Sequence, residues 1–384
     1  MTVRILHISD THLGKRQYRS DERLQDYADG FREAVEKAIS LDVDAVIHTG
    51  DLFDAPNPNV PVVNECLDII SLLDSVGIPF YGIVGNHERK RDQQWLDLVD
   101  RFDLVNRLDR TPTYIGTGED QFAVYGIDAV RSPEWETSDF TLPEPDKEAF
   151  VLLCMHELVN PPVPGHMAHY ETEEILNRTG IQVDGLALGD YHEDESANVN
   201  GTSVWYPGST EKTARDESEA HSVLELIYEN GTLSKTKHTL EQPREFIEVT
   251  IEFNEGDGLK SAKKEIEKYN FTGENGKKAV GIALLEGEET GVTPRDVHGL
   301  LDNNGAAVTK VIDNRGLINT EDIDAESVDM SEMEDLLDKE VEQIELNDTS
   351  QELEQLIRNE EIKKTNIRKK GAEILNESIN GSGK

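Results

Sequence analysis

Hydrophobic and polar positions follow two periods along roughly the first 240 residues. Short apolar runs, typical of buried strands, alternate with stretches whose apolar residues recur every three or four positions, as in amphipathic helices. The runs cover residues 3–9, 45–49, 80–84, 150–154 and 185–188, and the helical pattern covers 21–40, 62–76 and 92–101. Further strands are expected at 122–127, 204–206 and 222–228. This alternation predicts an α/β fold over residues 1–240.

A second unit is predicted from residue 245 to residue 318. Its pattern is strand, helix, strand, helix, strand, at 246–253, 258–269, 279–286, 294–303 and 307–313. We expect a small α+β domain, then a linker at 320–329.

The segment 330–384 follows a third pattern, that of short amphipathic helices. Met333, Leu337, Val341 and Ile344 fall on one helical stripe, and Thr349 with Glu352 has the spacing of a capping box that starts another helix. Two short amphipathic helices cannot bury their apolar faces alone, so they dock either on their own protein or in the groove of a partner.

Each of the five apolar runs ends in a short polar cluster. The clusters begin at Asp10, Gly50, Gly85, Met155 and Gly189. Parallel strands end on the same side of a sheet, so these clusters should converge at its carboxyl edge. The converging groups are carboxylates, imidazoles and one carboxamide, which are the ligands of a two-metal hydrolytic centre.

The residues themselves suggest how two metals could be held. Asp10 and His12 lie two apart, and in extended backbone such residues point the same way. Asp51 follows a glycine and could bridge two cations with its two oxygens. Asn86 offers a neutral oxygen, and the remaining ligands are expected to be His156, Asp190 and His192. Each motif alone is weak, because Gly-Asp and Gly-Asn are common turn dipeptides; the ordered set carries the prediction.

This ordered set resembles the calcineurin-like metallophosphoesterases over about the first 210 residues. The flanks "HISDTHLGKRQY", "GDLFDAPNP", "GNHE", "ALGDYHE" and "WYPGSTE" are similar to those of the meiotic-recombination-eleven (SbcD-type) double-strand-break repair nucleases. The resemblance implies a metallophosphoesterase sandwich, a small capping domain, and C-terminal helices at 330–384 that bind an ABC-type coiled-coil ATPase. It also implies a homodimer.

The resemblance further implies site roles. One manganese ion would be held by Asp10, His12, Asp51 and His192, and the other by Asp51, Asn86, His156 and Asp190. His87 would be the catalytic histidine. Two positions depart from the family pattern: Asp190 stands where the family usually has a histidine, and Asp54 stands where it often has one linked to exonuclease action.

Composition adds a constraint on the environment. The 384 residues include 78 acidic and 38 basic ones, giving a formal charge of −40. Acid spread along the whole chain, with few lysines, suits molar salt, where the Debye length is about 3 Å. We therefore expect a salt-adapted cytoplasmic, nucleoid-associated protein without a signal peptide or membrane span. Cys66 and Cys154 lie in apolar runs and are expected to be buried free thiols.

The leading hypothesis is a manganese-dependent DNA exonuclease or endonuclease subunit that processes broken ends. Basic residues that flank two of the motifs could contact phosphates: Lys15, Arg16, Arg19, Arg89, Lys90 and Arg91. Two alternatives stay open at this point. One is a mainly structural organiser of the repair complex; the other is a phosphoesterase for small molecules or phosphoproteins.

Overall fold

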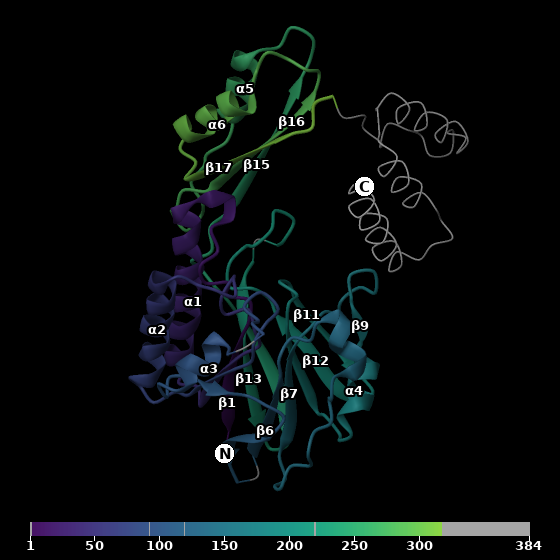
Figure 1. Ribbon diagram of the computed structural model, residues 1–384. Helices are drawn as coiled ribbons and strands as arrows, with labels where there is room; N and C mark the ends of the chain where they lie inside the picture. The colour runs from purple at the N-terminus through teal and green to yellow at the C-terminus, as the bar shows by residue number, and fades with distance from the viewer. Residues whose placement is uncertain (1, 92, 119, 219, 317–384) are drawn as a thin grey trace, which may run out of the picture. The chain divides into compact units, whose positions relative to one another are not determined.

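A sandwich of two six-stranded sheets forms the larger part of the chain (Figure 1). The structure is a computed structural model, and it describes residues 2–316 except 92, 119 and 219. The first sheet has the order β14 (Thr232–Thr239), β13 (Ser222–Glu229), β1 (Val3–Ile8), β2 (Ala45–His48), β3 (Phe80–Gly82) and β4 (Asn106–Arg107). The second has the order β11 (Asp194–Val199), β12 (Thr202–Pro207), β10 (Gly185–Gly189), β7 (Phe150–His156), β6 (Asp120–Ile127) and β5 (Thr113–Thr117).

The five polar clusters are therefore divided between two sheets, and the prediction that one sheet carries them all is wrong. Strands β1, β2 and β3 are parallel neighbours in the first sheet, whereas β7 and β10 are parallel neighbours in the second. Each set still ends on one side of its own sheet. The apolar runs could not reveal the division, because every one of them is buried on both faces.

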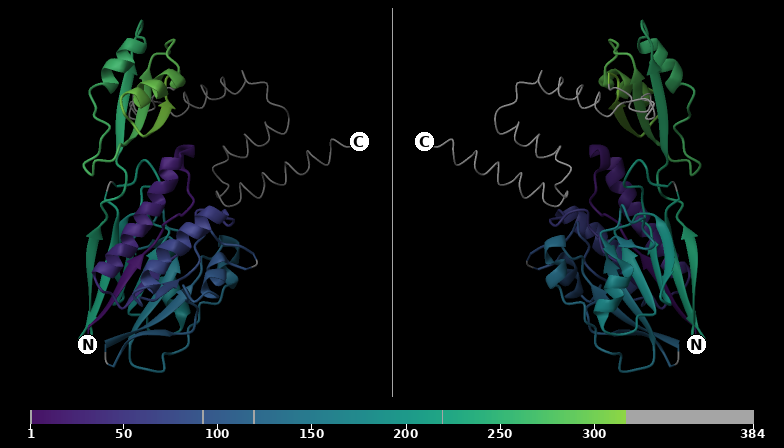
Figure 2. Two further views of the ribbon diagram at one scale, coloured as in Figure 1. Left: turned by 90° about the vertical axis from the view of Figure 1, so that its left-hand side faces the viewer. Right: turned by 90° about the vertical axis from the view of Figure 1, so that its right-hand side faces the viewer.

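Helices cover the outer face of each sheet. The first sheet packs against α1 (Asp21–Ser40), α2 (Val60–Asp74) and α3 (Trp95–Asp100), and the second against α4 (Thr172–Thr179) and the 3-10 helix η2 (Ser132–Thr137). Figure 2 shows α1 and α2 in front of the strands from one side and α4 in front of them from the other. A third apolar cluster, which includes Ile5, Ile47, Leu152 and Trp205, fills the space between the sheets. Cys66 and Cys154 are buried free thiols, as predicted.

Local capping explains where the helices begin. The Ser20 hydroxyl accepts hydrogen bonds from the amides of Glu22 and Arg23, so α1 begins where the pattern predicts. Helix α2 begins two residues earlier than predicted. The Asn59 side chain caps the Val62 amide at 3.1 Å, and a proline is tolerated in the first turn because it needs no amide partner there.

A smaller parallel sheet follows the sandwich. Its order is β15 (Phe246–Phe253), β16 (Val280–Gly287) and β17 (Val308–Asp313), connected through α5 (Leu259–Ile266) and α6 (Pro294–Asn303). The predicted sequence of elements is confirmed, but the predicted α+β class is wrong for this unit, because all three strands are parallel and alternate with helices, which is an α/β arrangement. The boundaries at 245 and 318 stay predictions, and the predicted linker and C-terminal helices lie outside the described residues.

Three buried charged side chains and the partly buried Arg244 form a network beside this sheet. The Arg23 guanidinium, fully buried, donates to Asp26 at 2.8 Å and to Glu211 at 3.1 Å. Arg244 donates to both oxygens of Asp26, at 2.6 and 2.8 Å. The network joins α1 to the segment before β15.

No helix among the described residues is long and apolar enough to span a membrane.

Candidate metal centre

The ends of five strands bring all seven predicted metal ligands into one cluster. The Nε2 atom of His156 lies 3.5 Å from Asp51 Oδ2, 3.7 Å from Asp190 Oδ1 and 3.9 Å from Asp10 Oδ1. On the other side, His12 Nε2 lies 3.8 Å from the same Asp51 oxygen and 3.2 Å from His192 Nε2. Three groups of ligand atoms among the described residues could each hold a cation: Asp10, His12 and His192; Asp10, Asp51 and His156; and His12, Asp54 and His87.

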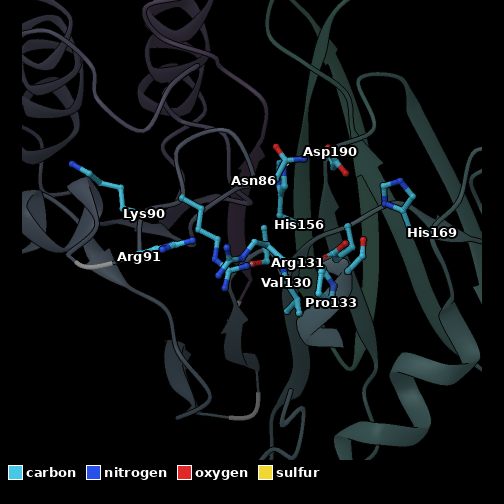
Figure 3. Close-up of a pocket in the computed structure, with 13 residues that line it drawn as sticks. Asn86, Lys90, Arg91, Val130, Arg131, Pro133, His156, His169 and Asp190 are labelled. Atoms are coloured by element: carbon cyan, nitrogen blue, oxygen red, sulfur yellow. Dashed lines mark hydrogen bonds and ion pairs between the residues drawn. The ribbon is translucent and has the colours of Figure 1, made fainter. Parts of the chain in front are cut away.

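Asn86 and Asp190 close the cluster on its exposed side, as Figure 3 shows. The Asn86 amide donates to Asp190 Oδ1 at 3.0 Å, which leaves the Asn86 carbonyl oxygen as the atom that could bind a cation. The sequence therefore predicted the members of this cluster correctly as neighbours. Which cation each of them binds stays a prediction.

Unpartnered buried atoms show that the cluster fits a cation. Asp51 Oδ2 and His156 Nε2 are buried and have no hydrogen-bond partner within the described part of the chain. The opposite ring nitrogen of His156 donates to the Thr49 carbonyl at 2.7 Å, which directs Nε2 toward the surrounding carboxylates. Burial lowers the pKa of His156, but Asp51 and Asp10 outweigh it and raise the pKa well above its usual range, so these carboxylates favour a positive charge at Nε2, either a proton or a cation. His12 Nε2 and His192 Nε2 lie 3.2 Å apart, within hydrogen-bond distance of each other.

The backbone conformation of the predicted ligands differs from the prediction. Asp10 and His12 were expected to share a direction because they lie two apart in extended backbone. Instead both are left-handed, with φ of 53° and 45°, and so are Asp51 and Asp190, at 56° and 85°. Left-handed backbone is strained for residues other than glycine and is held by its surroundings. Here the His12 amide donates to the Asp51 carbonyl at 2.9 Å, which ties the first two clusters together.

Glycines allow the strand ends to approach so closely. A Cβ on Gly85 would lie 2.1 Å from Asp51 Oδ1, and one on Gly50, whose φ is +98°, would lie 2.5 Å from His156 Nδ1. Any side chain at either position would displace a predicted ligand.

Burial and charge adjust the pKa values in the cluster. Burial lowers the pKa of His12, although Asp54 and Asp51 act against it, so the ring is neutral and keeps a lone pair for a cation. Burial raises the pKa of Asp51, but the charge of the nearby His156 outweighs it, and the pKa of Asp51 falls below its usual range. Asp51 is therefore a carboxylate, positioned between the two imidazoles as a bridging ligand would be.

Two carboxylates that sequence reasoning missed orient the cluster. Glu217 accepts a hydrogen bond from His192 Nδ1 at 2.6 Å, which directs Nε2 toward Asp10. Glu88 is buried and accepts from the amides of Leu52, Phe53 and Gly85, so it joins the loops after β2 and β3. Glu88 was visible within the "GNHE" motif, whereas no local signal marks Glu217, which is distant from His192 in sequence.

His87 lies at the open side of the cluster, with 45% of its side chain exposed. Its Nε2 is 4.0 Å from Asp51 Oδ2, and its Nδ1 donates to the Asp54 carbonyl at 3.2 Å. The Asp54 carboxylate lies 3.4 Å from His12 Nδ1 and 3.2 Å from Lys15 Nζ. Burial raises the pKa of Asp54, but the contact with His12 and the charge of Lys15 prevail and lower it. Asp54 is thus an anion that supports two histidines, rather than a proton donor.

Three other histidines make hydrogen bonds with residues outside the set of predicted ligands. His7 and His48 are buried and hydrogen bond to Thr49 and Thr11, and His298 bonds to Thr309 away from the cluster. His169 is different, because it lines the cavity beside the cluster.

Comparison with known proteins identifies the family. Residues 3–194 match the calcineurin-like phosphoesterase model. The chain is 33% identical over 369 residues to the DNA double-strand break repair protein Mre11 of Haloferax volcanii, covering 95% of this chain and 80% of that protein. The chain belongs to the Mre11 family of calcineurin-like phosphoesterases.

Other Mre11 proteins give the same result. The one from Methanosarcina acetivorans is 34% identical over 95% of this chain and 59% of its own length, and the one from Halobacterium salinarum is 28% identical over 96% and 92%. The predicted sandwich fold is confirmed by this membership, and so is the class of enzyme, a metal-dependent phosphodiesterase. The role of each ligand and of His87 stays a prediction.

Proposed function

We propose that this chain is a manganese-dependent DNA nuclease subunit that processes broken double-strand ends. The observation that carries the proposal is the position of Asp51 Oδ2, which is buried without a hydrogen-bond partner among the described residues and lies 3.5 Å from His156 Nε2 and 3.8 Å from His12 Nε2. DNA as the substrate is supported by the Mre11 relatives, which are DNA double-strand break repair proteins by name. Manganese is favoured by the mixed set of carboxylate, carboxamide and imidazole ligands.

Two divalent cations would be held by two ligand sets that share Asp51. The first set is Asp10, His12, Asp51 and His192, and the second is Asp51, Asn86, His156 and Asp190. When bound, the cations would neutralise the phosphate charge, lower the pKa of a coordinated water and stabilise the leaving oxygen.

His87 supplies the protein's own proton chemistry in this mechanism. Its Nδ1 is held by the Asp54 carbonyl, so its Nε2 faces the open side where a substrate phosphate would lie. Water adds to phosphorus as the bond to the sugar oxygen breaks, and the His87 ring donates the proton that the leaving oxygen needs. The Asp54 carboxylate lies close to this ring, with Oδ1 3.6 Å from His87 Nδ1.

The proposal includes two partners. The segment 330–384 would bind an ABC-type coiled-coil ATPase through its amphipathic helices, and the catalytic domain would form a homodimer. The first partner is supported by the stripe that begins at Met333 and by the capping box at Thr349. Both partners are open to measurement by mixing the purified chains and determining the mass of the complex.

The test is cleavage of end-labelled linear duplex and hairpin DNA in molar potassium chloride, with manganese or magnesium, by wild type and His87→Ala. We expect manganese-dependent cutting that falls by about 10²–10⁴-fold in the variant while metal affinity is kept. His298→Ala, a histidine outside the cluster, is the matched control and should cut at the wild-type rate. Wild-type protein that hydrolyses p-nitrophenyl phosphate but never DNA, even with the ATPase present, would refute the proposal in favour of a small-molecule phosphoesterase.

A further inference from the structure

A series of buried hydrogen bonds connects the core between the two sheets with the predicted ligand His156. It begins at Trp205 on β12 of the second sheet, crosses to His7 on β1 of the first sheet, and reaches Thr49 directly after β2 (Figure 1). Trp205, His7 and Thr49 are each 0% exposed. The main-chain carbonyl of Thr49 accepts the hydrogen bond from His156 Nδ1 at 2.7 Å. The series therefore joins three side chains outside the ligand set to one inside it.

The donors and acceptors of this series fit in one direction only. The indole N–H of Trp205 can only donate, and it lies 3.0 Å from His7 Nδ1, so that nitrogen is the acceptor. Burial lowers the pKa of His7 to about 3, and the nearby His48 and Lys235 act in the same direction, so the ring is neutral and carries a single proton. That proton is on Nε2, which donates to the Thr49 hydroxyl oxygen at 2.8 Å. Trp205 thus selects the tautomer of His7 that holds Thr49.

Thr49 has little freedom to move. Its amide donates to the Ile8 carbonyl at 3.1 Å, and its hydroxyl oxygen accepts from His7. A Cβ on Gly189 would lie 2.4 Å from the Thr49 carbonyl oxygen and 2.7 Å from His156 Nδ1, so the end of β10 closes the space beside this bond. Because so little space remains around the bond, a displaced Thr49 would turn the His156 ring with it.

Packing alone explains these polar groups less well. Trp205 belongs to the apolar cluster between the sheets, together with Ile5 and Leu152. A hydrogen bond within a protein contributes only about 0.5–1.5 kcal/mol to stability, and an apolar pair of the same shape is often nearly as stable. The stability that His7 and Trp205 provide could therefore come from apolar side chains, whereas the hold on Thr49 could not.

We propose that Trp205 and His7 are positioning residues, which act through Thr49 to keep His156 Nε2 directed toward a cation. This inference rests on the proposed function, in which His156 binds the second of two cations. A hydrogen-bonding partner that orients a metal-ligating histidine contributes about 10–100-fold in metal affinity. Trp205 and His7 lie further from the cation than such a partner, so we expect an effect at the lower end of that range.

The experiment measures manganese affinity by calorimetric titration of the full-length chain in molar potassium chloride, without DNA. The first variant is Trp205→Phe, which removes the indole N–H and keeps an aromatic ring. Its matched control is Trp135→Phe, because Trp135 on η2 is also buried and its indole N–H donates to Glu174 at 2.8 Å. Thermal unfolding in the presence of a chelator measures how much each substitution lowers the stability of the fold.

Two substitutions of His7 separate hydrogen bonding from packing. His7→Gln keeps an oxygen that can accept from Trp205 and an N–H that can donate to Thr49, whereas His7→Phe keeps a flat ring and has neither. We expect Trp205→Phe and His7→Phe to bind one of the two manganese ions about 10-fold less tightly. His7→Gln should bind both ions within about 2-fold of wild type, and Trp135→Phe should lose stability without losing affinity.

The tautomer of His7 provides a readout that needs no loss of binding. Nitrogen-15 chemical shifts of labelled histidine in the metal-free protein, assigned with His7→Gln, should place the proton on Nε2. A proton on Nδ1 would overturn the inference, because Trp205 could not then donate to that atom. Equal manganese affinities for Trp205→Phe and Trp135→Phe would overturn it as well.

The positioning role and the nuclease activity fail separately in these measurements. A chain that binds manganese but cuts no DNA would refute the proposed nuclease, while the affinities of the Trp205 and His7 variants would still decide the positioning role. Wild-type protein that binds no manganese would overturn both.

Discussion

Two buried clusters of charged side chains in this protein are built in opposite ways. In the network of Arg23, Asp26, Glu211 and Arg244, each charge meets an opposite one, and no buried side-chain nitrogen or oxygen of these four residues lacks a hydrogen-bond partner. In the cluster around Asp51, carboxylates and imidazoles face one another, and Asp51 Oδ2 and His156 Nε2 are unpartnered among the described residues.

The difference distinguishes buried charges that stabilise the fold from buried charges that we assign to cation binding. A charged network that the protein satisfies by itself needs nothing further and holds α1 to the segment before β15. A cluster that leaves buried atoms unpartnered has a cost in folding free energy, since an unpaired buried polar group costs about 1–3 kcal/mol. That cost is removed when a cation binds. Left-handed backbone at Asp10, His12 and Asp51 adds strain in the same place.

The strongest way to test this comparison is to remove the charge at its centre. In Asp51→Asn, the amide keeps an oxygen but loses the negative charge that we assign to bridging two cations. We expect the cleavage rate to fall by about 10⁴-fold or more, because several kcal/mol of cation-dependent stabilisation would be lost. Rate measurements with manganese, together with a metal titration, check this. Stability without metal should not decrease, and a variant that cuts normally would show that Asp51 does not bridge.

For the network around Arg23, we expect a substitution to lower stability. Arg23→Ala leaves Asp26 and Glu211 buried with fewer partners, and we expect the free energy of unfolding to fall by about 3–5 kcal/mol. Denaturant titration measures it. The control is Arg32→Ala on the same helix, whose exposed pair with Glu65 should be worth no more than about 1 kcal/mol. Similar losses of unfolding free energy in Arg23→Ala and Arg32→Ala would show that the buried network does not stabilise the fold more than an ordinary surface pair does.

Metal addition should stabilise the protein only through the cluster around Asp51. At a free manganese concentration about 100 times the dissociation constant, we expect the free energy of unfolding to rise by about 2.7 kcal/mol per site. Thermal unfolding with and without a chelator, at fixed molar salt, follows this change. It should persist in Arg23→Ala and disappear in Asp51→Asn, and its persistence in the latter would place the metal elsewhere.

The smallest effect is expected for Glu217, which hydrogen bonds to a predicted ligand and is not itself a predicted ligand. Glu217→Gln keeps the shape of the side chain but weakens its hold on His192 Nδ1, and we expect manganese affinity to fall by about 10–100-fold. Calorimetric titration gives the affinity directly, independent of activity. Glu195→Gln, a change of the same type at an exposed position on β11, serves as the control. An unchanged affinity in Glu217→Gln would reduce Glu217 to a loop contact with Thr213.

Much of the fold was predictable because its strands and helices are strongly patterned. Helix α1 and strand β15 begin and end at the predicted residues, since an apolar face of fixed period and a capping serine are local signals. Strand β14 was not predicted. Its sequence, TLSKTKHT, is polar on an edge, and only its pairing with β13 makes it a strand. Strands β5 and β11 and helix α4 were also missed, each in a different part of the chain.

The sequence by itself determined which residues would lie together in the candidate site. Asp10, His12, Asp51, Asn86, His87, His156, Asp190 and His192 each follow or end a buried strand, and that order along the chain was sufficient to expect them in one place. Only the tertiary structure decided how they meet: two sheets rather than one, left-handed backbone rather than extended, and Glu217 behind His192. These features depend on contacts between residues far apart in the chain, which no local pattern of hydrophobic and polar positions records.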